Sequence, residues 1–537
     1  MKMSKKMGAI LLSVVMLATL LAGCKGKDTA SSTAPNASNT DASSTGGANT
    51  YTMFMRSTYA DWIKELKWYD EAVKRTGITV EYISGPEEFS DFYSEVDQRI
   101  ISNTLPDATM TKLTQTNVYG PQGVFMDLAP KIKEYAPNLQ KYIDNDPIYK
   151  SLVTNEEGAI YGLSKETPIF ADLIGYRVDH FTKAGIDPES VITVEDFTNA
   201  LRKLKEFYGK DNKNYYPLSG RDNAIRFAAW FGAASNISAE ESNGVYIAGH
   251  YKDGSIDIMN DGAYKMTETM KVWYDEGLIN PEWISGTTSE ADWEASMLNG
   301  NSTLFYDYYN RAQWFMDNGG PEADPDYQMG VLNFLKDENG KTMKVTTSVK
   351  YNDETVTAVN ANASEETVKA ILTFIDYMYS EEGIILANYG VEGESYEITA
   401  DGEKEFIVDY AEQEATPAGE KKWSFLSDRL TVTKPVDDEA FFKWNAPLIS
   451  EATARLFTEE NLMTSYTLKF TDIESKELSN LVANVYDSQI AGIVSFINGS
   501  RELNEAEWAA FQQEMNDKGL ARIEEIQLQA YRNTYGS

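Results

Sequence analysis

The chain has 537 residues, 42% of them hydrophobic, and its formal net charge at pH 7 is −35. This length predicts two or three domains with substantial cores. The strong negative charge argues against nucleic acid and anionic membrane surfaces as partners. The single cysteine, Cys24, excludes an internal disulfide. Two histidines, His180 and His250, argue against histidine-rich metal sites and most catalytic schemes that need a histidine base.

Residues 1–23 have the pattern of a secretory signal peptide. Three lysines precede an apolar run that is too short to span a membrane. Leu21-Ala22-Gly23-Cys24 resembles the lipobox of bacterial lipoproteins. The resemblance implies a lipid on the sulfur of Cys24 and an anchor on the extracellular face of the cell membrane. The alternative is an ordinary signal peptide with an incidental cysteine. Residues 24–50, rich in small polar residues, are predicted to be a flexible tether.

Strands and helices alternate at the start of the folded part. Residues 51–55 and 78–83 are predicted strands, and apolar side chains at helical spacing predict one helix between them. Gly77 is expected to end that helix, and another begins near Ser90. The apolar face of the first helix consists of Trp62, Leu66, Tyr69 and Val73. This alternation predicts an α/β domain with a parallel sheet.

Later segments predict further strands and a passage between lobes. Residues 159–163 and 174–177 flank a proline-containing segment that we expect to cross from one lobe to the other. Thr193 to Asp196 have the pattern of a capping box at the start of a helix. Residues 302–306 are expected to form a strand that returns to the first lobe, and residues 356–359 another strand.

A run at residues 380–396 resembles a known family. It reads Ser-Glu-Glu-Gly, then Asn-Tyr-Gly-Val-Glu-Gly, then Tyr396. This run is similar to a stretch of the lipoprotein solute-binding proteins of bacterial ABC importers, in the large-oligosaccharide subgroup of the family that includes maltose-binding protein. Other segments agree in the same order, namely 105–107, 135–139, 161–163, 176–179, 273–281, 496–499 and 519–532.

The resemblance implies an α/β fold, a two-lobe periplasmic-binding-protein-like clamp with three inter-lobe crossings. The first lobe would comprise residues 51–170 plus 303–389, and the second lobe residues 171–302 plus 390–537. An oligosaccharide would bind between the lobes, and the loaded monomer would dock on the transmembrane subunits of an ABC permease. No catalytic residue and no cofactor is implied.

One segment departs from the family pattern. Related oligosaccharide binders often carry a calcium loop before a Pro-Leu turn, but residues 210–218 offer few oxygen ligands around Asp211. Calcium prefers about 6–8 oxygen ligands. We therefore expect no metal site, and the alternative is a weak degenerate one.

Sugars present apolar faces to aromatic rings and hydroxyl groups to polar side chains. Since ligands of parallel sheets bind beyond the carboxyl ends of the strands, the loops at 56–61 and near Asp107 belong at such a site. Arg177 could equally form a structural ion pair, and Trp230 could equally fill a core. The candidate ligand-binding residues are Tyr59, Trp62, Asp107, Tyr161, Arg177, Trp230, Asp307, Tyr308, Tyr309, Trp314 and Trp444.

Two other functions stay open at this stage. An exported glycosidase needs only a pair of carboxylates, which so acidic a chain always offers. A peptide or metal-complex receptor could use the same clamp, although two histidines argue against the metal complex. Against an enzyme, the sequence contains no nucleophile elbow, phosphate loop or metal-ligand cluster. Neither the sugar nor the permease can be identified from these residues.

Overall fold

The computed structural model describes residues 49–221, 227, 230–231, 236–238, 244–246, 259–286, 288–426, 433–463, 465–466 and 468–535. The predicted signal peptide, Cys24, most of the predicted tether and His250 lie outside these residues. Within these ranges, no helix has both the length and the apolar character that crossing a membrane requires.

The first sheet has the strand order β2-β1-β3-β11-β4. Its strands are β1 (Thr50–Arg56), β2 (Thr79–Gly85), β3 (Ala108–Thr111), β4 (Leu163–Glu166) and β11 (Tyr351–Val359). β1 pairs in parallel with β2 and β3, while β11 is antiparallel to β3 and β4. Hence β1, β3 and β4 run in one direction, and their carboxyl ends share one edge of the sheet, which we call the first edge. The predicted strands at 51–55, 78–83 and 356–359 are confirmed.

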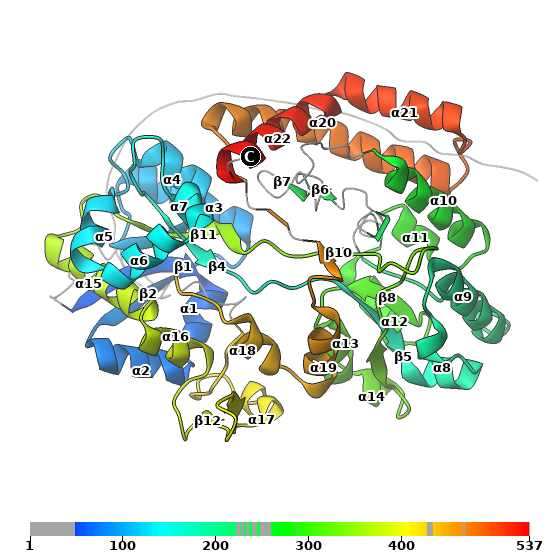
Figure 1. Cartoon of the computed structure of the whole chain (residues 1–537), viewed down its shortest axis with the longest axis horizontal. Coiled ribbons are helices and arrows are strands. Elements are labelled where there is room, and N and C mark those ends of the chain that lie inside the picture. Colours follow the sequence, from blue (N-terminus) through cyan, green and yellow to red (C-terminus); the bar gives the residue numbers. More distant parts are fainter. Residues whose placement is uncertain are drawn as a thin grey trace, which may run out of the picture. The chain divides into compact units, whose positions relative to one another are not determined.

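The helices of this region cover the sheet and pack on one another. They are α1 (Ser57–Ile63), α2 (Lys67–Thr76), α3 (Phe89–Ser102), α4 (Leu113–Tyr119), α5 (Ala129–Tyr135), α6 (Pro137–Asn145), α7 (Pro147–Val153), α15 (Glu365–Met378) and α16 (Glu381–Asn388). α15 contacts β1 as well as α5 and α6, so segments far apart in sequence share one core (Figure 1).

The single helix predicted across residues 62–73 is wrong, because a turn at residues 64–65 and an extended Leu66 separate α1 from α2. Leu66 has φ −88° and ψ 125°. The Lys67 amide donates to the Lys422 carbonyl at 2.9 Å, and the Lys422 amide donates to the Glu65 carbonyl at 2.8 Å. Pairing with a distant segment thus replaces helical hydrogen bonds. Gly77 ends α2 in the left-handed conformation, as predicted.

The second sheet has the order β8-β5-β9 and is antiparallel throughout. Its strands are β5 (Leu173–Arg177), β8 (Leu304–Asp307) and β9 (Met329–Val331). The expectation that residues 302–306 return to the first lobe is therefore wrong, because β8 pairs with β5, with Leu304 opposite Tyr176. Every residue of β8 is buried. A short buried strand carries no sequence signal for which sheet it joins.

Further helices pack beside the second sheet, and others follow along the chain to its end (Figure 1). They are α8 (Val178–Ala184), η1 (Pro188–Ser190), α9 (Val194–Tyr208), α10 (Asp261–Asp275), α11 (Pro281–Ile284), α12 (Glu290–Leu298), α13 (Arg311–Asp317), α14 (Gly320–Ala323), α17 (Tyr410–Glu414), α18 (Asp438–Lys443), α19 (Pro447–Leu456), α20 (Asp472–Ile497), α21 (Glu505–Lys518) and α22 (Leu520–Tyr535). The predicted capping box of Thr193 and Asp196 begins α9. α20 contacts α10, and α22 contacts α7.

Short strand pairs complete the fold. They are β6 (Asn236–Ser238) with β7 (Gly244–Tyr246), β10 (Val345–Thr346) with β14 (Leu462–Met463), and β12 (Tyr396–Ile398) with β13 (Lys404–Phe406).

The chain passes between the two sheets three times, from β4 to β5, from β9 to β11, and from α16 to α18 and α19. Hydrogen bonds join these passages to one another. The Thr167 amide donates to the Lys350 carbonyl at 2.8 Å. The amide of Ile169 donates to Oδ1 of Asp438 at 3.0 Å. The amide of Val436 donates to Oε2 of Glu166 at 2.7 Å. The three passages therefore form one connected region.

Candidate ligand-binding site

Cations and aromatic rings gather at the first edge. The guanidinium of Arg56, the last residue of β1, lies 3.8 Å from the ring centroid of Phe89 and 4.9 Å from that of Tyr59. Its Nε donates to the main-chain carbonyl of Glu87. The ammonium of Lys165 on β4 lies 5.8 Å from the Tyr59 ring. Tyr59 was predicted, whereas the two cations were not singled out.

Lys112, which follows β3, extends the same edge. Its ammonium lies 4.5 Å from the ring centroid of Tyr93 and 3.2 Å from a carboxylate oxygen of Glu354. The hydroxyl of Tyr93 donates to the main-chain carbonyl of Glu354. Burial and the neighbouring Glu354 carboxylate raise the pKa of Tyr93 well above its usual value, so this hydroxyl stays a donor at neutral pH.

A second polar cluster follows β8. Asp307, the last residue of β8, is 1% exposed and accepts two hydrogen bonds from the guanidinium of Arg221, at 2.8 and 3.1 Å. That guanidinium lies 4.9 Å from the ring centroid of Tyr308, which is 44% exposed. The carbonyl of Arg221 accepts a hydrogen bond from the indole of Trp283 at 3.0 Å. We call Arg221, Asp307 and Tyr308 the second edge. An aromatic face and fixed donors are what a sugar ring requires.

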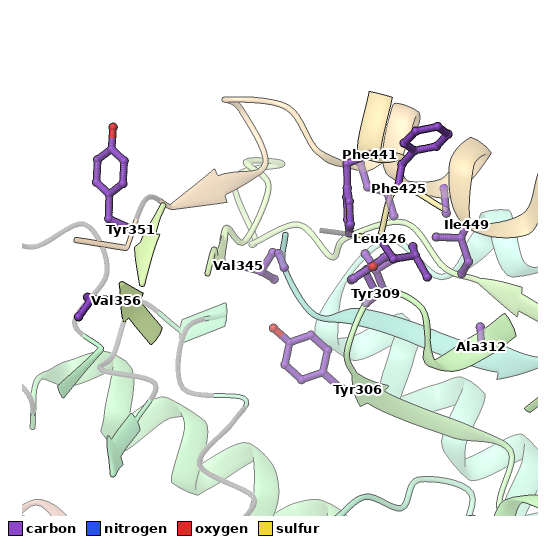
Figure 2. Packing of buried hydrophobic residues seen from close by; sticks show 14 of the residues in the cluster. Tyr306, Tyr309, Ala312, Val345, Tyr351, Val356, Phe425, Leu426, Phe441 and Ile449 are labelled. Carbon is purple, nitrogen blue, oxygen red and sulfur yellow. The ribbon is translucent and has the colours of Figure 1, made fainter. Parts of the chain in front are cut away.

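Tyr309 lies behind this cluster and is buried. Its ring centroid is 5.3 Å from that of Phe170 and 5.9 Å from those of Phe441 and Phe442. Figure 2 shows Tyr309 and Phe441 within this hydrophobic packing. Tyr309 therefore supports its exposed neighbour, Tyr308, from inside.

A cavity of about 1190 Å³ lies next to the passages. Phe442, Phe457 and Tyr466 supply aromatic surface, and Thr453 and Asp438 supply polar groups. Burial raises the pKa of the Asp438 carboxyl to about 6. None of the predicted site residues lines this cavity. The aromatic stretch before Pro447 was the one sequence signal near it, since Phe442 belongs to that stretch.

Asp107 and Arg177 have structural partners in the fold. Asp107 is buried and accepts from the amide and hydroxyl of Thr52, at 2.9 and 2.7 Å, which ties β3 to β1. Arg177 is buried against the ring of Tyr327 and is paired with Asp179 at 2.7 Å. The ion-pair alternative for Arg177 is the arrangement observed.

The predicted tryptophans fall into two groups. Trp230 and Trp444 are buried, and the indole of Trp444 donates to Glu414 at 3.0 Å. Trp62 and Trp314 are partly buried, and Trp314 lies 5.1 Å from the guanidinium of Arg311.

Tyr161 is partly buried, and its ring covers Gly120 so closely that any larger residue at position 120 would collide with it. The structure thus brings Asp307, Tyr308 and Tyr309 together, while Tyr59 joins the first edge.

Side chains of the loop near Asp211 form hydrogen bonds with other residues of the protein. Asn212 donates to Asn301 at 2.7 Å and accepts from the amide of Asn214 at 3.0 Å. Among the residues that the structure describes, no group of three or more His, Cys, Asp or Glu side chains is placed to hold a metal ion.

Comparisons with known proteins agree with these features. The family model described as "Bacterial extracellular solute-binding protein" matches residues 59–385. Lipoprotein LipO of Bacillus subtilis is 26% identical over 289 residues, covering 51% of this chain and 53% of LipO. The fructooligosaccharide ABC transporter substrate-binding protein FusA of Streptococcus pneumoniae is 26% identical over 351 residues, covering 60% of this chain and 59% of FusA. The match thus spans somewhat more than half the length of either relative.

The crystal structure of alginate-binding protein AlgQ2 without calcium ion superposes with a TM-score of 0.64 at 17% identity, covering 91% of this chain and 98% of AlgQ2. This likeness confirms the predicted fold class, an α/β two-lobe clamp of the periplasmic-binding-protein type. Since the family model covers well over half of the residues, the chain belongs to the bacterial extracellular solute-binding protein family.

Proposed function

We propose that this protein is the substrate-binding lipoprotein of an ABC transporter and captures an oligosaccharide for import. The observation that carries the proposal is the second edge, where an exposed tyrosine ring lies beside a guanidinium fixed by the buried Asp307. FusA, a relative that is itself a fructooligosaccharide-binding protein of an ABC transporter, supports the same class of ligand.

The mechanism follows from the two edges. The apolar face of a sugar ring stacks on Tyr308, beside the guanidinium of Arg221. Tyr59 and its neighbours at the first edge contact another part of the ligand. A ligand that touches both lobes favours the closed state by its differential affinity. The connected passages act as the hinge, and the closed form docks on the permease.

The remaining assignments are also proposals. We assign residues 51–170 plus 351–389 to one lobe and 171–331 to the other. α19 and α20 belong with the second lobe, since they contact α13 and α10, whereas residues 422–424 pair with the first. Cys24 carries the lipid that holds a monomeric protein on the extracellular face of the membrane. The protein binds its sugar without cleaving it.

The test is a binding screen of the purified protein against oligosaccharides by thermal shift and calorimetry. A ligand at 100 times its Kd adds about 2.7 kcal/mol of stability. Tyr308→Ala is expected to weaken binding about tenfold or more, because it removes the exposed stacking face. Phe207→Ala is the matched control, since Phe207 is 48% exposed on α9, away from both edges. Recovery of a cleaved sugar would favour the glycosidase instead. A panel without any hit would exclude the oligosaccharide class.

A further inference from the structure

Three cations occupy the carboxyl ends of three strands that run in the same direction. They are Arg56 on β1, Lys112 after β3 and Lys165 on β4. The chain as a whole has 83 acidic and 48 basic residues. The edge also carries carboxylates, since Glu354 pairs with Lys112 and Glu166 is the last residue of β4. Since such an edge is where ligands meet a parallel sheet, its charge bears on the ligand.

Arg56 has different partners from the other buried or half-buried arginines. Arg177, Arg221 and Arg311 each pair with a carboxylate at 3.0 Å or less. Within the described residues, no carboxylate lies within ion-pair distance of Arg56, whose Nε binds the main-chain carbonyl of Glu87. Its positive charge is therefore held in place without being neutralised.

Stacking leaves this guanidinium able to bind an anion. Arg56 lies over the rings of Phe89 and Tyr59, at 3.8 and 4.9 Å, and its side chain is half-buried. Rings that hold an arginine also limit its rotamers, which lowers the entropy cost of binding. The N–H groups of a guanidinium held in this way can donate two parallel hydrogen bonds to one carboxylate.

The same geometry argues against stacking of a neutral sugar at this place. One face of the Phe89 ring is occupied by Arg56 at 3.8 Å. Aromatic surface covered by a cation is not free for a pyranose face. Tyr59 and Tyr308 each have a guanidinium at 4.9 Å. What distinguishes the two edges is that Asp307 neutralises Arg221, whereas aromatic rings and a main-chain carbonyl hold Arg56.

We propose that the first edge binds a carboxylate of the sugar, so that the ligand is an acidic oligosaccharide built from uronic acid units. This inference rests on the proposed function, because it names the chemical class of the sugar that the clamp captures. Arg56 forms the bidentate contact.

The experiment is calorimetry of the purified protein with matched ligands. The probes are trisaccharides of galacturonate, glucuronate and mannuronate, the methyl ester of each, and neutral fructo- and malto-oligosaccharides. Esterification removes the charge and keeps the sugar skeleton. At least one acid form is expected to bind ten or more times more tightly than its ester, and its affinity is expected to fall as salt rises.

Variants assign the effect to Arg56. Arg56→Gln is expected to weaken binding of the acid form at least tenfold and to narrow the difference in affinity between the acid form and its ester. Arg56→Lys keeps the positive charge but cannot form the bidentate contact, so it is expected to weaken binding of the acid form less than Arg56→Gln does. Arg532→Gln, an exposed arginine on α22, is the matched control. Circular dichroism and melting curves establish whether each variant is folded. If Arg56→Gln does not fold, Arg56→Lys serves as the test.

The outcomes separate the two proposals. Equal affinity for acid and ester, preference for a neutral sugar, or an equal loss for both forms in Arg56→Gln would overturn the acidic ligand and leave sugar binding standing. Absence of binding to every sugar in the panel would overturn both proposals.

Discussion

The two edges of this protein hold their arginines in opposite ways. At the second edge, the buried carboxylate of Asp307 binds Arg221 through two hydrogen bonds, so the charge is neutralised and the guanidinium serves as a rigid donor beside Tyr308. At the first edge, aromatic rings and a main-chain carbonyl hold Arg56, and its charge stays available. We propose accordingly that the paired Arg221 positions a neutral part of the ligand, whereas Arg56 binds a charged one.

Breaking the pair at the second edge has the largest expected effect on stability. Asp307→Ala leaves Arg221 with a half-buried charge, and removal of one partner of a buried pair costs about 3 kcal/mol or more. Urea denaturation measures the loss in the free energy of unfolding. Asp317→Ala, an exposed aspartate on α13, is the control and is expected to stay within about 0.5 kcal/mol. A similar small loss for Asp307→Ala would contradict the role given to this carboxylate.

An intermediate effect concerns Asp438, which lies between the edges at the passages. Burial raises its pKa from the ordinary value of 3.8 to about 6, and the Glu166 carboxylate acts in the same direction. The folded protein therefore holds this proton more tightly than the unfolded chain. Stability is highest below about pH 4, falls between about pH 4 and 6, and is then constant for this group.

Asp438→Asn removes that titration but keeps a side-chain oxygen for the amide of Ile169. Relative to wild type, the variant is expected to gain stability as the pH rises from about 4 to 6. The measurement is the urea midpoint of both proteins from pH 4 to 8. A difference between the two proteins that does not change with pH would show that Asp438 titrates in its ordinary range.

The smallest stability effect is expected at the first edge. Glu354→Gln breaks a partly exposed ion pair with Lys112, which contributes less than about 1 kcal/mol. The same change removes a negative charge from the edge, so it is expected to raise affinity for a uronate trisaccharide and leave its ester unaffected. Calorimetry with both ligands measures this difference. Weaker binding of the acid form would contradict the electrostatic account of this edge.

Local patterns in the sequence predicted many elements and several ends of helices. The alternating residues 78–83, the Gly77 cap and the Thr193–Asp196 capping box all occur as predicted, because each depends on neighbours within a few residues. The break between α1 and α2 was missed, because the pairing of Leu66 with Lys422 joins segments that no local pattern relates.

The candidate site was predicted in part. Aromatic residues after a strand pointed to Tyr59 and Tyr308, and both lie at an edge. Arg56, Lys112, Lys165 and Arg221 were not singled out, since a cation in a sequence does not reveal whether a carboxylate will neutralise it. Trp230 and Trp444 are of a residue type that is common on sugar-binding surfaces, but both are buried.

The sequence by itself determined the fold class and the family, because periodicity, turn residues and ordered motifs are properties of neighbouring positions. Only the tertiary structure decided which sheet β8 joins, which aromatic rings stay exposed and which cations keep their charge. Those properties depend on contacts between segments hundreds of residues apart. For the same physical reason, the proposed chemistry of the ligand rests on the folded edges and not on the composition of the chain.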